Sequence, residues 1–379
     1  MAAYVRAMPP VPIVAPIVAI VLPPKEGFST AAVGAIGLLV KRHARAASGF
    51  RSVVFGQPQD RPFAGIDHCG VRPSWFPGNA TRRYAGGLLR ALRALKPDLV
   101  EVHNRPDVAL FLAARLPLPV TLFLHNDPQT MRAARRAHQR QTMQDRLAGV
   151  VAVSRHIAER MPVPGRVAVL PNCLDLAELP PRQAVRDPLI LFAGRVVADK
   201  GADSFVQACA LALPQLPGWR AEMIGADRFR TDSADTKFLA ALRPQAAAAG
   251  VLLHGFRPHA DVLVAMARAS LVVVPSRWAE PFGLTALEAL ATGTALLFAP
   301  NGGLPEVVGE AGVPIDPNNP AAMAAALVAL ARDPARRASL GDAGRARAAR
   351  FDIAPILAKL DMLRRQTLDA WPRAASAPI

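Results

Sequence analysis

Short apolar runs recur along the whole chain and predict buried strands. Each run is rich in Val, Ile and Leu and lacks the alternating polar positions of a strand with one face in water. Such runs are typical of parallel strands that are covered on both faces. The first set is Ile17–Leu22, Ser52–Phe55, Leu99–Val102, Val120–Leu124, Gly149–Val153 and Val167–Leu170. The second set is Leu189–Ala193, Arg220–Ile224, Val251–His254, Leu271–Val274, Ala295–Phe298 and Gly312–Ile315.

Amphipathic stretches of helical period separate most of these runs, and helical patterns dominate after Asn319. Alternation of strand and helix is the signature of βαβ units. Because it occurs twice, we predict an α/β protein with two doubly wound, parallel-sheet (Rossmann-like) domains. The 379 residues suit two domains of about 100–200 residues each. Pro320, Pro334 and Pro355 stand where helices could begin.

Proline is frequent between the two sets of strands, where it interrupts any regular element. The prolines concerned are Pro171, Pro180, Pro181 and Pro188. We therefore expect a first domain over residues 1–180 and a second over residues 181–354. A C-terminal helix at about residues 355–379 is expected to pack back on the first domain.

One strand-to-helix turn carries an acid at a ligand edge. After the run at 271–274 the loop holds Glu280, in the order Glu-Pro-Phe-Gly. A helix is expected to begin at residues 283–285, to run through Ala291 and to stop at Gly293. In open parallel sheets the ligand binds at the carboxyl ends of the strands, and the first amides of a helix there lack backbone partners.

A second acid follows about one turn into that helix. Glu288 lies between Leu287 and Leu290, and a buried carboxylate needs a donor. Hydroxyls of a sugar or a ribose would serve, and so would a neighbouring arginine. The alternative is a solvated face with a favourable helix-dipole contribution.

Two cations stand in another loop at the same kind of edge. Gly194-Arg195 follows the run at 189–193, and Lys200-Gly201 opens the next helix. Cations beside a helix N-terminus suit a diphosphate. The alternative is an exposed charged loop.

The charge of the chain bears on its partners. The net charge is +16 and the isoelectric point is near 11.1. Phosphate-bearing substrates, an anionic membrane surface and nucleic acid are partners that would suit this charge. The alternative explanation is a bacterial proteome that is rich in arginine. No nucleic-acid recognition motif accompanies the α/β pattern, so nucleic acid is not expected. The cysteines, Cys69, Cys173 and Cys209, lack metal-ligand spacing and fit a reducing compartment.

No segment is expected to span a membrane. The apolar run at 11–22 contains Pro12 and Pro16 and is shorter than the roughly 20 residues that a span requires. Arg6 before it would also suit a signal peptide, but a buried first strand fits better. We expect a cytoplasmic protein, with peripheral attachment to the inner face of the plasma membrane as an option.

The first domain offers candidates for acceptor binding. His103-Asn104 and His125-Asn126-Asp127 both follow strand ends. Several arginines in Met131–Arg140 are spaced by three and four residues, which would place them on one side of a helix. They are Arg132, Arg135, Arg136 and Arg140. Such a helix could contact anionic lipid or a phosphorylated acceptor, or be a solvated face. Another aromatic and basic stretch comprises Trp75, Phe76, Arg82, Arg83 and Tyr84.

Together these segments resemble one family. The run Glu280–Glu288 is similar to the E-x7-E motif of retaining glycosyltransferases of family four, which have the two-domain GT-B fold. Further similar segments follow in the expected order. They are Leu122–Asp127, Leu170–Asp175, Phe192–Arg195 with Lys200-Gly201, His254–Phe256, and Asn301–Glu306 with its Gly-Gly-x-Pro-Glu turn.

Two positions depart from the family pattern. Cys173 replaces the usual glycine of the Pro-Asn-Gly-Val-Asp segment. The loop after the first strand, residues 23–30, has the single glycine Gly27 where many members carry Gly-Gly. Ser29 or Thr30 is expected to cap the helix that follows this loop.

The resemblance implies two domains that face a central cleft and a UDP- or GDP-linked sugar as donor. It implies that Arg195 and Lys200 hold the diphosphate, that Glu280 binds the transferred sugar and that Glu288 binds the ribose. The implied donor-binding set is Gly27, Gly194, Arg195, Lys200, Gly225, Phe256, Glu280, Phe282, Gly283, Leu284, Thr285 and Glu288. The implied catalytic set is His125, Glu280, Arg195 and Lys200. The candidate acceptor-binding residues are His103, Asn126, Arg132, Arg135 and Arg136.

The predicted reaction is transfer of a hexose, with retention, to a glycan or lipid-linked acceptor in cell-envelope polysaccharide synthesis, lipopolysaccharide included. No metal and no other cofactor is expected, because Arg195 and Lys200 would stabilise the departing diphosphate. Two alternatives keep the same fold. One is a nucleotide-sugar epimerase or a phosphorylase, and the other is a non-catalytic subunit that binds nucleotide sugars.

Overall fold

The computed structural model describes residues 15–30, 33–45, 49–75, 78–227 and 235–372. The chain divides into two compact units. The first comprises the described residues up to Leu122, Arg146–Ala148 and the described residues from Leu360 onward. The second comprises Phe123–Asp145 and Gly149–Lys359.

The first sheet has seven strands in the order β3-β2-β1-β4-β5-β6-β7. The strands are β1 Ile17–Val21, β2 Arg51–Gly56, β3 Asp67–Gly70, β4 Leu99–His103, β5 Val120–Leu124, β6 Gly149–Ala152 and β7 Ala168–Val169. Strand β1 pairs in parallel with both β2 and β4. All six runs predicted for this sheet are strands, so the α/β prediction is confirmed here.

Among the strands of the described residues, β3 alone is not predicted by the apolar pattern. It is a four-residue segment, Asp-His-Cys-Gly, and it pairs only with β2 at the edge of the sheet. An edge strand needs little apolar surface, because only one neighbour and part of one face cover it. The segment is therefore polar and has no apolar run.

The second sheet has six strands in the order β10-β9-β8-β11-β12-β13. They are β8 Asp187–Ala193, β9 Arg220–Ile224, β10 Val251–Gly255, β11 Ala269–Val274, β12 Ala295–Phe298 and β13 Val313–Pro314. Their pairings are parallel. Every predicted run of the second set is a strand, and the prediction of a second parallel-sheet domain is confirmed.

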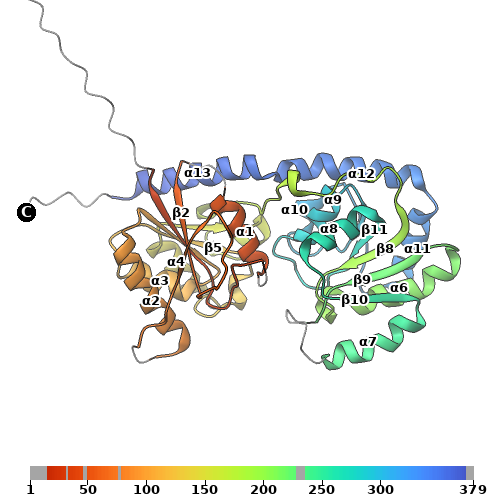
Figure 1. The fold of residues 1–379 in the computed structure, drawn as a ribbon, viewed down its shortest axis with the longest axis horizontal. Coiled ribbons are helices and arrows are strands. Elements are labelled where there is room, and N and C mark those ends of the chain that lie inside the picture. The colour runs from red at the N-terminus through yellow and green to blue at the C-terminus, as the bar shows by residue number, and fades with distance from the viewer. Residues whose placement is uncertain (1–14, 31–32, 46–48, 76–77, 228–234, 373–379) are drawn as a thin grey trace, which may run out of the picture. The chain divides into compact units, whose positions relative to one another are not determined.

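The helices lie between the strands, as the period predicts (Figure 1). They are α1 Ala35–Arg45, α2 Ala80–Leu95, α3 Pro106–Ala113, α4 Ala137–Arg146, α5 Arg155–Ala158, α6 Ala202–Ala212, α7 Lys237–Ala248, α8 His259–Arg268, α9 Leu284–Ala291, α10 Leu304–Val308, α11 Pro320–Ala331, α12 Pro334–Ala348 and α13 Ile353–Ala370. Pro320 and Pro334 open α11 and α12, as predicted. Pro355 lies in the first turn of α13, two residues after its start at Ile353.

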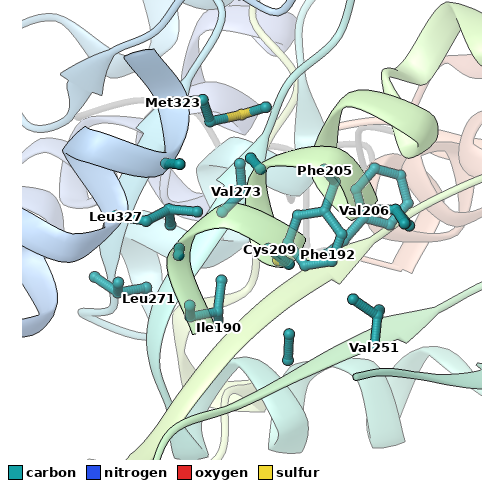
Figure 2. Close-up of a cluster of buried hydrophobic side chains, with 14 of the residues drawn as sticks. Ile190, Phe192, Phe205, Val206, Cys209, Val251, Leu271, Val273, Met323 and Leu327 are labelled. Atoms are coloured by element: carbon teal, nitrogen blue, oxygen red, sulfur yellow. The ribbon is translucent and has the colours of Figure 1, made fainter. Parts of the chain in front are cut away.

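One face of the second sheet is covered by an apolar cluster (Figure 2). Ile190 and Phe192 from β8 and Leu271 and Val273 from β11 contribute side chains that are at most 2% exposed. Helices α6 and α11 complete the cluster with Phe205, Val206, Cys209, Met323 and Leu327. Each large apolar side chain buried in this way contributes about 1.5–3 kcal/mol to folding, so the rigid base of the second unit is this cluster.

Two of the cysteines are buried apolar residues, as expected. Cys173 and Cys209 are both 0% exposed, and burial raises the pKa of the Cys209 thiol. Cys69 is partly exposed on the edge strand β3. All three are free thiols.

In the first unit a buried ion pair joins α13 to β4. The guanidinium of Arg364 donates two hydrogen bonds of 2.8 Å to the carboxylate of Glu101, and both side chains are 1% exposed. The guanidinium also lies over the ring of Phe50. This contact spans 263 residues of sequence, and no local pattern predicts it.

Candidate functional site

Two loops of the second unit meet where the strand order of its sheet reverses. The order changes direction between β8 and β11, since β9 follows β8 on one side and β12 follows β11 on the other. In doubly wound sheets this reversal opens a ligand site at the carboxyl ends of the two strands. The loop after β8 holds Arg195 and Lys200, and the loop after β11 holds Glu280.

Lys200 and Glu280 form an ion pair, with the ammonium of Lys200 donating to the carboxylate of Glu280. The Glu280 side chain is 10% exposed and that of Lys200 is 25% exposed. The sequence therefore predicted both residues at the ligand edge, but it did not predict that they contact each other. A buried carboxylate that is paired in this way stays available to accept further hydrogen bonds through its remaining lone pairs.

Gly201 makes this pairing possible. It adopts a φ of 69°, and a Cβ at this position would lie 2.0 Å from the carbonyl oxygen of Pro275. Only glycine allows such an approach, so the turn before α6 packs directly on the loop after β11. The side chain of Lys200, the preceding residue, is thereby brought to Glu280.

Arg195 lies in the same loop as Lys200, between β8 and α6, and is exposed. Its guanidinium makes no hydrogen bond or ion pair with any residue in the part of the chain that the structure describes. An unpaired guanidinium at the carboxyl edge of a parallel sheet is a suitable partner for a phosphate group.

Three glycines at the carboxyl ends of neighbouring strands present bare backbone, which we call the glycine floor. Gly194, Gly225 and Gly255 follow or end β8, β9 and β10, all with positive φ. The amide of Gly194 donates to Ile224, and that of Gly225 donates to Gly255. A Cβ on Gly225 would lie 1.8 Å from the Gly194 oxygen, whereas the space over Gly194 and Gly255 is open. A ligand can therefore approach this backbone closely.

A pocket of about 300 Å³ adjoins this floor. Phe256 and Arg257 line it together with Gly225 and Gly255, and the Phe256 side chain is 48% exposed. Ligand pockets commonly measure about 300–1,000 Å³. The volume of this pocket is at the lower end of that range, and the ring of Phe256 offers a surface on which a planar group could stack.

Helix α9 begins at the acidic loop, as predicted. Its N-cap is Gly283, with a φ of 98°, and no side chain caps the helix. A Cβ on Gly283 would lie 2.4 Å from a methyl group of Leu304, so the turn requires glycine. The first amides of the helix, at Leu284 and Thr285, are free for a ligand. The predicted end is also confirmed, because Gly293 follows α9 with a φ of 70°.

Gly302 and Gly303 hold the acidic loop in place. The amide of Gly303 donates to the carbonyl oxygen of Glu280 at 2.6 Å. A Cβ on Gly302 would lie 2.3 Å from the same oxygen, and one on Gly303 would lie 2.6 Å from the oxygen of Pro281. The Gly-Gly turn noted in the sequence thus has a packing role: its bare backbone supports the backbone of the acidic loop.

Glu288 is buried in α9 and pairs with His259, a residue that the sequence did not single out. The Nε2 atom of His259 lies 2.7 Å from Oε1 of Glu288. The sequence predicted that this acid needs a donor and named hydroxyls or an arginine. The available signal was His259 itself, which follows Pro258 at the start of α8, four residues after Gly255.

Helix α5 is tied to the same region. The carboxylate of Glu306 accepts hydrogen bonds from the amides of Arg155 and His156 at 2.8 and 2.7 Å. The hydroxyl of Ser154, the N-cap of α5, donates to the oxygen of Pro281 at 2.6 Å. A carboxylate at a helix N-terminus is favoured by the helix dipole. No local sequence pattern predicts these contacts, because the partners lie 127 to 151 residues apart.

His125 directly follows β5 and is buried, whereas Asn126 beside it is exposed. Burial lowers the pKa of His125 to about 4. The imidazole is therefore neutral at physiological pH and can donate one hydrogen bond and accept another. His103, at the end of β4 in the first unit, is 0% exposed.

The predicted basic face over Met131–Arg140 is wrong. Helix α4 begins only at Ala137, and the preceding residues form turns in which Ala133 has a φ of 68°. Arg140 is buried and donates to the carbonyl oxygens of Ala134 and Arg135. That inward arginine closes the turn. Three exposed arginines remain on the turns rather than on one helix face, namely Arg132, Arg135 and Arg136.

The predicted cap of the first helix is also wrong. Helix α1 begins at Ala35, several residues beyond Ser29 and Thr30. The carboxylate of Glu26 instead accepts a hydrogen bond of 2.8 Å from the amide of Gly37 in the first turn. Burial raises the pKa of Glu26. An internal carboxylate therefore occupies this helix N-terminus, close to Gly27.

The aromatic and basic stretch of the first unit is only partly exposed. Trp75 is 81% exposed, and Arg82 and Arg83 are exposed as well. Tyr84 is 4% exposed and donates to the oxygen of Leu22, so it belongs to the core. Phe76 lies outside the described residues.

The structure adds two findings about metals and membranes. Among the described residues, no three His, Cys, Asp or Glu side chains come together as a metal ion would require. In the same part of the chain, no helix combines the length and apolar character that crossing a bilayer demands.

Two family models match the chain. Residues 39–178 match Glycosyltransferase Family 4, and residues 180–347 match Glycosyl transferases group 1. The chain is 32% identical over 258 residues to the lipopolysaccharide core biosynthesis mannosyltransferase LpcC of Rhizobium leguminosarum bv. viciae, covering 63% of this chain and 69% of that protein. Two further curated relatives, each 32% identical, are covered over only 19% and 44% of their lengths.

Solved structures share the fold. The sucrose-phosphate synthase of Thermosynechococcus elongatus superposes with a TM-score of 0.76 at 21% identity, over 94% of this chain and 100% of that one. Anabaena Alr3699/HepE, in complex with UDP-glucose, superposes with a TM-score of 0.74 at 17% identity, over 92% of this chain and 99% of that one. At these identities the likeness establishes the architecture of the chain.

Proposed function

This chain belongs to the GT-B glycosyltransferases of group 1 and family 4, and on that premise we propose which sugar chemistry it performs. We propose that it moves a hexose, with retention, from a nucleoside-diphosphate sugar to a glycan or lipid-linked acceptor. The observation that carries the proposal is the ion pair of Lys200 and Glu280 at the strand-order reversal, with the exposed Arg195 in the same loop as Lys200.

Arg195 and Lys200 are the proposed partners of the diphosphate. During transfer the bond between the anomeric carbon and the diphosphate oxygen breaks, and negative charge grows on the leaving group. Two positioned cations stabilise that charge. We propose that they do so without a metal or another cofactor.

The acidic loop and α9 are proposed to hold the sugar. Glu280 would accept hydrogen bonds from sugar hydroxyls while Lys200 holds its carboxylate in place. The amides of Phe282, Gly283, Leu284 and Thr285 precede or open an uncapped helix, where anionic and polar groups bind well. Glu288 would bind the ribose, and the floor of Gly194 and Gly225 with Phe256 would receive the nucleotide.

Residues 1–180 are proposed to bind the acceptor and residues 181–354 the donor, with residues 355–379 belonging to the first domain. His125, neutral because of its lowered pKa, is proposed to lie at the reacting centre. Acceptor contacts are proposed for His103, Asn126 and the exposed turn with Arg132, Arg135 and Arg136. Gly27 is proposed to contribute to donor binding, next to Glu26, whose carboxylate accepts from the amide of Gly37 in α1.

The donor is proposed to be a sugar linked to UDP or GDP. HepE was solved with UDP-glucose, and LpcC is named as a mannosyltransferase of lipopolysaccharide core biosynthesis. Together with the net charge of +16, these relatives support cell-envelope polysaccharide synthesis at the cytoplasmic face of an anionic membrane.

A ligand panel tests the proposal. The purified chain is heated with UDP-, GDP- and ADP-linked sugars, and a bound donor should raise the unfolding temperature, since ligand at 100 times Kd adds about 2.7 kcal/mol. The stabilising donor is then incubated alone and with lipid-linked and glycan acceptors. Transfer only with acceptor, giving a product of unchanged anomeric configuration, is expected. Conversion of donor alone would indicate an epimerase and overturn the proposal.

A further inference from the structure

The partner of Glu288 carries an inference that rests on the proposed function. Only one oxygen of this carboxylate, Oε1, is bonded within the described chain, to Nε2 of His259. The other oxygen makes no hydrogen bond to a described residue, and it is not enclosed by protein. Glu288 thus presents one anchored oxygen and one open oxygen.

The surroundings of Glu288 make this anchoring necessary. Its neighbours in α9, Leu287, Ala289 and Leu290, are each 0% exposed. The Glu288 side chain itself is 9% exposed, against 35% for His259. Burying a carboxylate in such apolar surroundings is costly unless it is hydrogen-bonded, and one oxygen already has its donor.

The placement of His259 is set by the backbone. Gly255 ends β10 with a φ of 69°, and the chain then turns through Phe256 to Pro258, the N-cap of α8. The carbonyl oxygen of Pro258 accepts from the amides of Asp261 and Val262, which fixes the first turn. Helices α8 and α9 pack together. The imidazole therefore lies on a rigid helix start that follows the glycine floor directly.

The chemistry fixes the direction of the hydrogen bond. A carboxylate can only accept, so Nε2 of His259 carries the proton. A ribose presents two neighbouring hydroxyl donors, which need acceptors. We propose that His259 is a positioning residue of the donor site: by holding Oε1 of Glu288, it leaves the second oxygen oriented to accept from the ribose hydroxyls.

This role differs from simple stabilisation of a buried acid. If His259 only stabilises the fold, its loss should lower the unfolding temperature and weaken the binding of all nucleotides by the same factor. If it positions the ribose acceptor, its loss should reduce the preference for ribose over 2′-deoxyribose, because that preference comes from the hydroxyl contacts.

The test compares binding of UDP, 2′-deoxy-UDP and pyrophosphate by isothermal titration, with the corresponding guanosine nucleotides if UDP is not bound. His259→Ala should weaken the affinity for UDP by about 5–50-fold. It should lower the ratio of the affinities for UDP and 2′-deoxy-UDP at least fivefold, while the affinity for pyrophosphate stays within twofold of the wild-type value. His259→Gln offers an amide donor and should restore part of the preference. In a Glu288→Ala background, His259→Ala should produce no further loss of preference.

A matched control is Glu222→Ala, which breaks another His–Glu pair of the second unit, between Glu222 and His254 at 2.9 Å. It should leave the ribose preference unchanged. His259→Phe keeps a ring without a donor and provides the same comparison if the alanine variant does not fold. An unchanged preference in both variants, with normal UDP binding by the wild type, would overturn the inference alone. Wild-type protein that binds no nucleoside diphosphate would overturn the proposed function as well.

Discussion

At the residue scale, the candidate site depends on paired charges. Lys200 pairs with Glu280 and His259 pairs with Glu288, so both acids are held in a defined orientation before any ligand arrives. A preoriented polar group loses less conformational entropy on binding than a mobile one. Arg195 is an exposed cation in the loop that also holds Lys200.

Glu288→Ala should weaken binding of the nucleotide sugar. The change removes the acceptor of the ribose hydroxyls and leaves His259 without its partner, at a cost of about 1–3 kcal/mol. Calorimetric titration with the donor identified by thermal shift measures this directly. Glu310→Ala, at an exposed position of the same unit, is the control, and equal affinity in both variants would refute the ribose assignment.

His125 should make stability fall in acid. Burial lowers its folded pKa to about 4, from 6.5 in its ordinary state. Above pH 6.5 the imidazole is neutral in both states and this contribution is fully present. Between pH 6.5 and 4 only the unfolded chain takes up the proton, so up to about 3 kcal/mol is lost as pH falls.

Urea unfolding at several pH values tests this effect. His125→Asn should show a shallower decline of the free energy of unfolding between pH 6.5 and 4 than the wild type. The stability of the His125→Asn variant at pH 7.5 depends on packing and does not enter this comparison of slopes. Parallel curves for the two proteins over that range would contradict the prediction.

At the element scale, the turns between strands and helices decide the geometry of the site. Gly201, Gly225, Gly283 and Gly302 each adopt a positive φ and each approach another segment too closely for a Cβ. These glycines therefore set the distances between the loops after β8, β9, β11 and β12. The apolar strands beneath them supply a rigid base.

Gly201→Ala should be more damaging than an alanine at a positive-φ glycine in open surroundings. Both substitutions pay the left-handed backbone cost of about 1–2 kcal/mol, but only at position 201 does the Cβ meet a backbone oxygen, at 2.0 Å. Gly218→Ala is the matched control, with a φ of 82° and nothing within 4 Å.

We expect Gly201→Ala to lower the free energy of unfolding by at least about 2 kcal/mol more than Gly218→Ala, as overpacking commonly costs about 1–3 kcal/mol. Denaturant titration of the two variants measures the difference. Transferase activity should fall as well, because the Lys200–Glu280 pair would shift. Equal stabilities would mean that the Pro275 loop moves aside freely.

At the scale of the whole molecule, sequence-distant segments are held by buried charge. Arg364 and Glu101 lie 263 residues apart and are both 1% exposed. Removing one partner of such a pair leaves an uncompensated buried charge, which costs about 3–5 kcal/mol. Arg364→Ala should therefore lower the unfolding temperature markedly.

The double variant Glu101→Leu with Arg364→Met is the control for that prediction. It removes both charges and keeps apolar volume, so it should recover most of the stability lost in Arg364→Ala. Thermal unfolding of the three proteins at one pH makes the comparison. A double variant that is no more stable than Arg364→Ala would show that side-chain shape, rather than charge, holds α13 to β4.

Metal independence is a prediction about the complete reaction. If Arg195 and Lys200 stabilise the departing diphosphate, chelator should leave the transferase rate unchanged within about twofold. The assay uses the donor and acceptor found in the ligand panel, with and without EDTA. A rate that vanishes with EDTA and returns with Mg²⁺ would refute the two-cation assignment.

Much of this protein follows from its sequence alone. Every predicted apolar run became a strand, and the turn that opens α9 lies where Gly283 predicts it, because strand period and glycine or proline position act over a few neighbouring residues. Strand β3 was missed because an edge strand needs little apolar surface. The arginines at 132–136 were wrongly assigned to one helix face. Their spacing fits a helix, but these residues form turns and α4 begins only at Ala137.

Only the tertiary structure decided which side chains meet. Lys200 and Glu280 lie 80 residues apart, and His259 and Glu288 lie 29 apart. Their contacts depend on the order in which the strands pair and on glycines that let loops approach. The sequence by itself determined the α/β fold and the ligand edge with its two acids, because those depend on local pattern. Tertiary structure supplied the partners, because strand order is a property of the whole sheet.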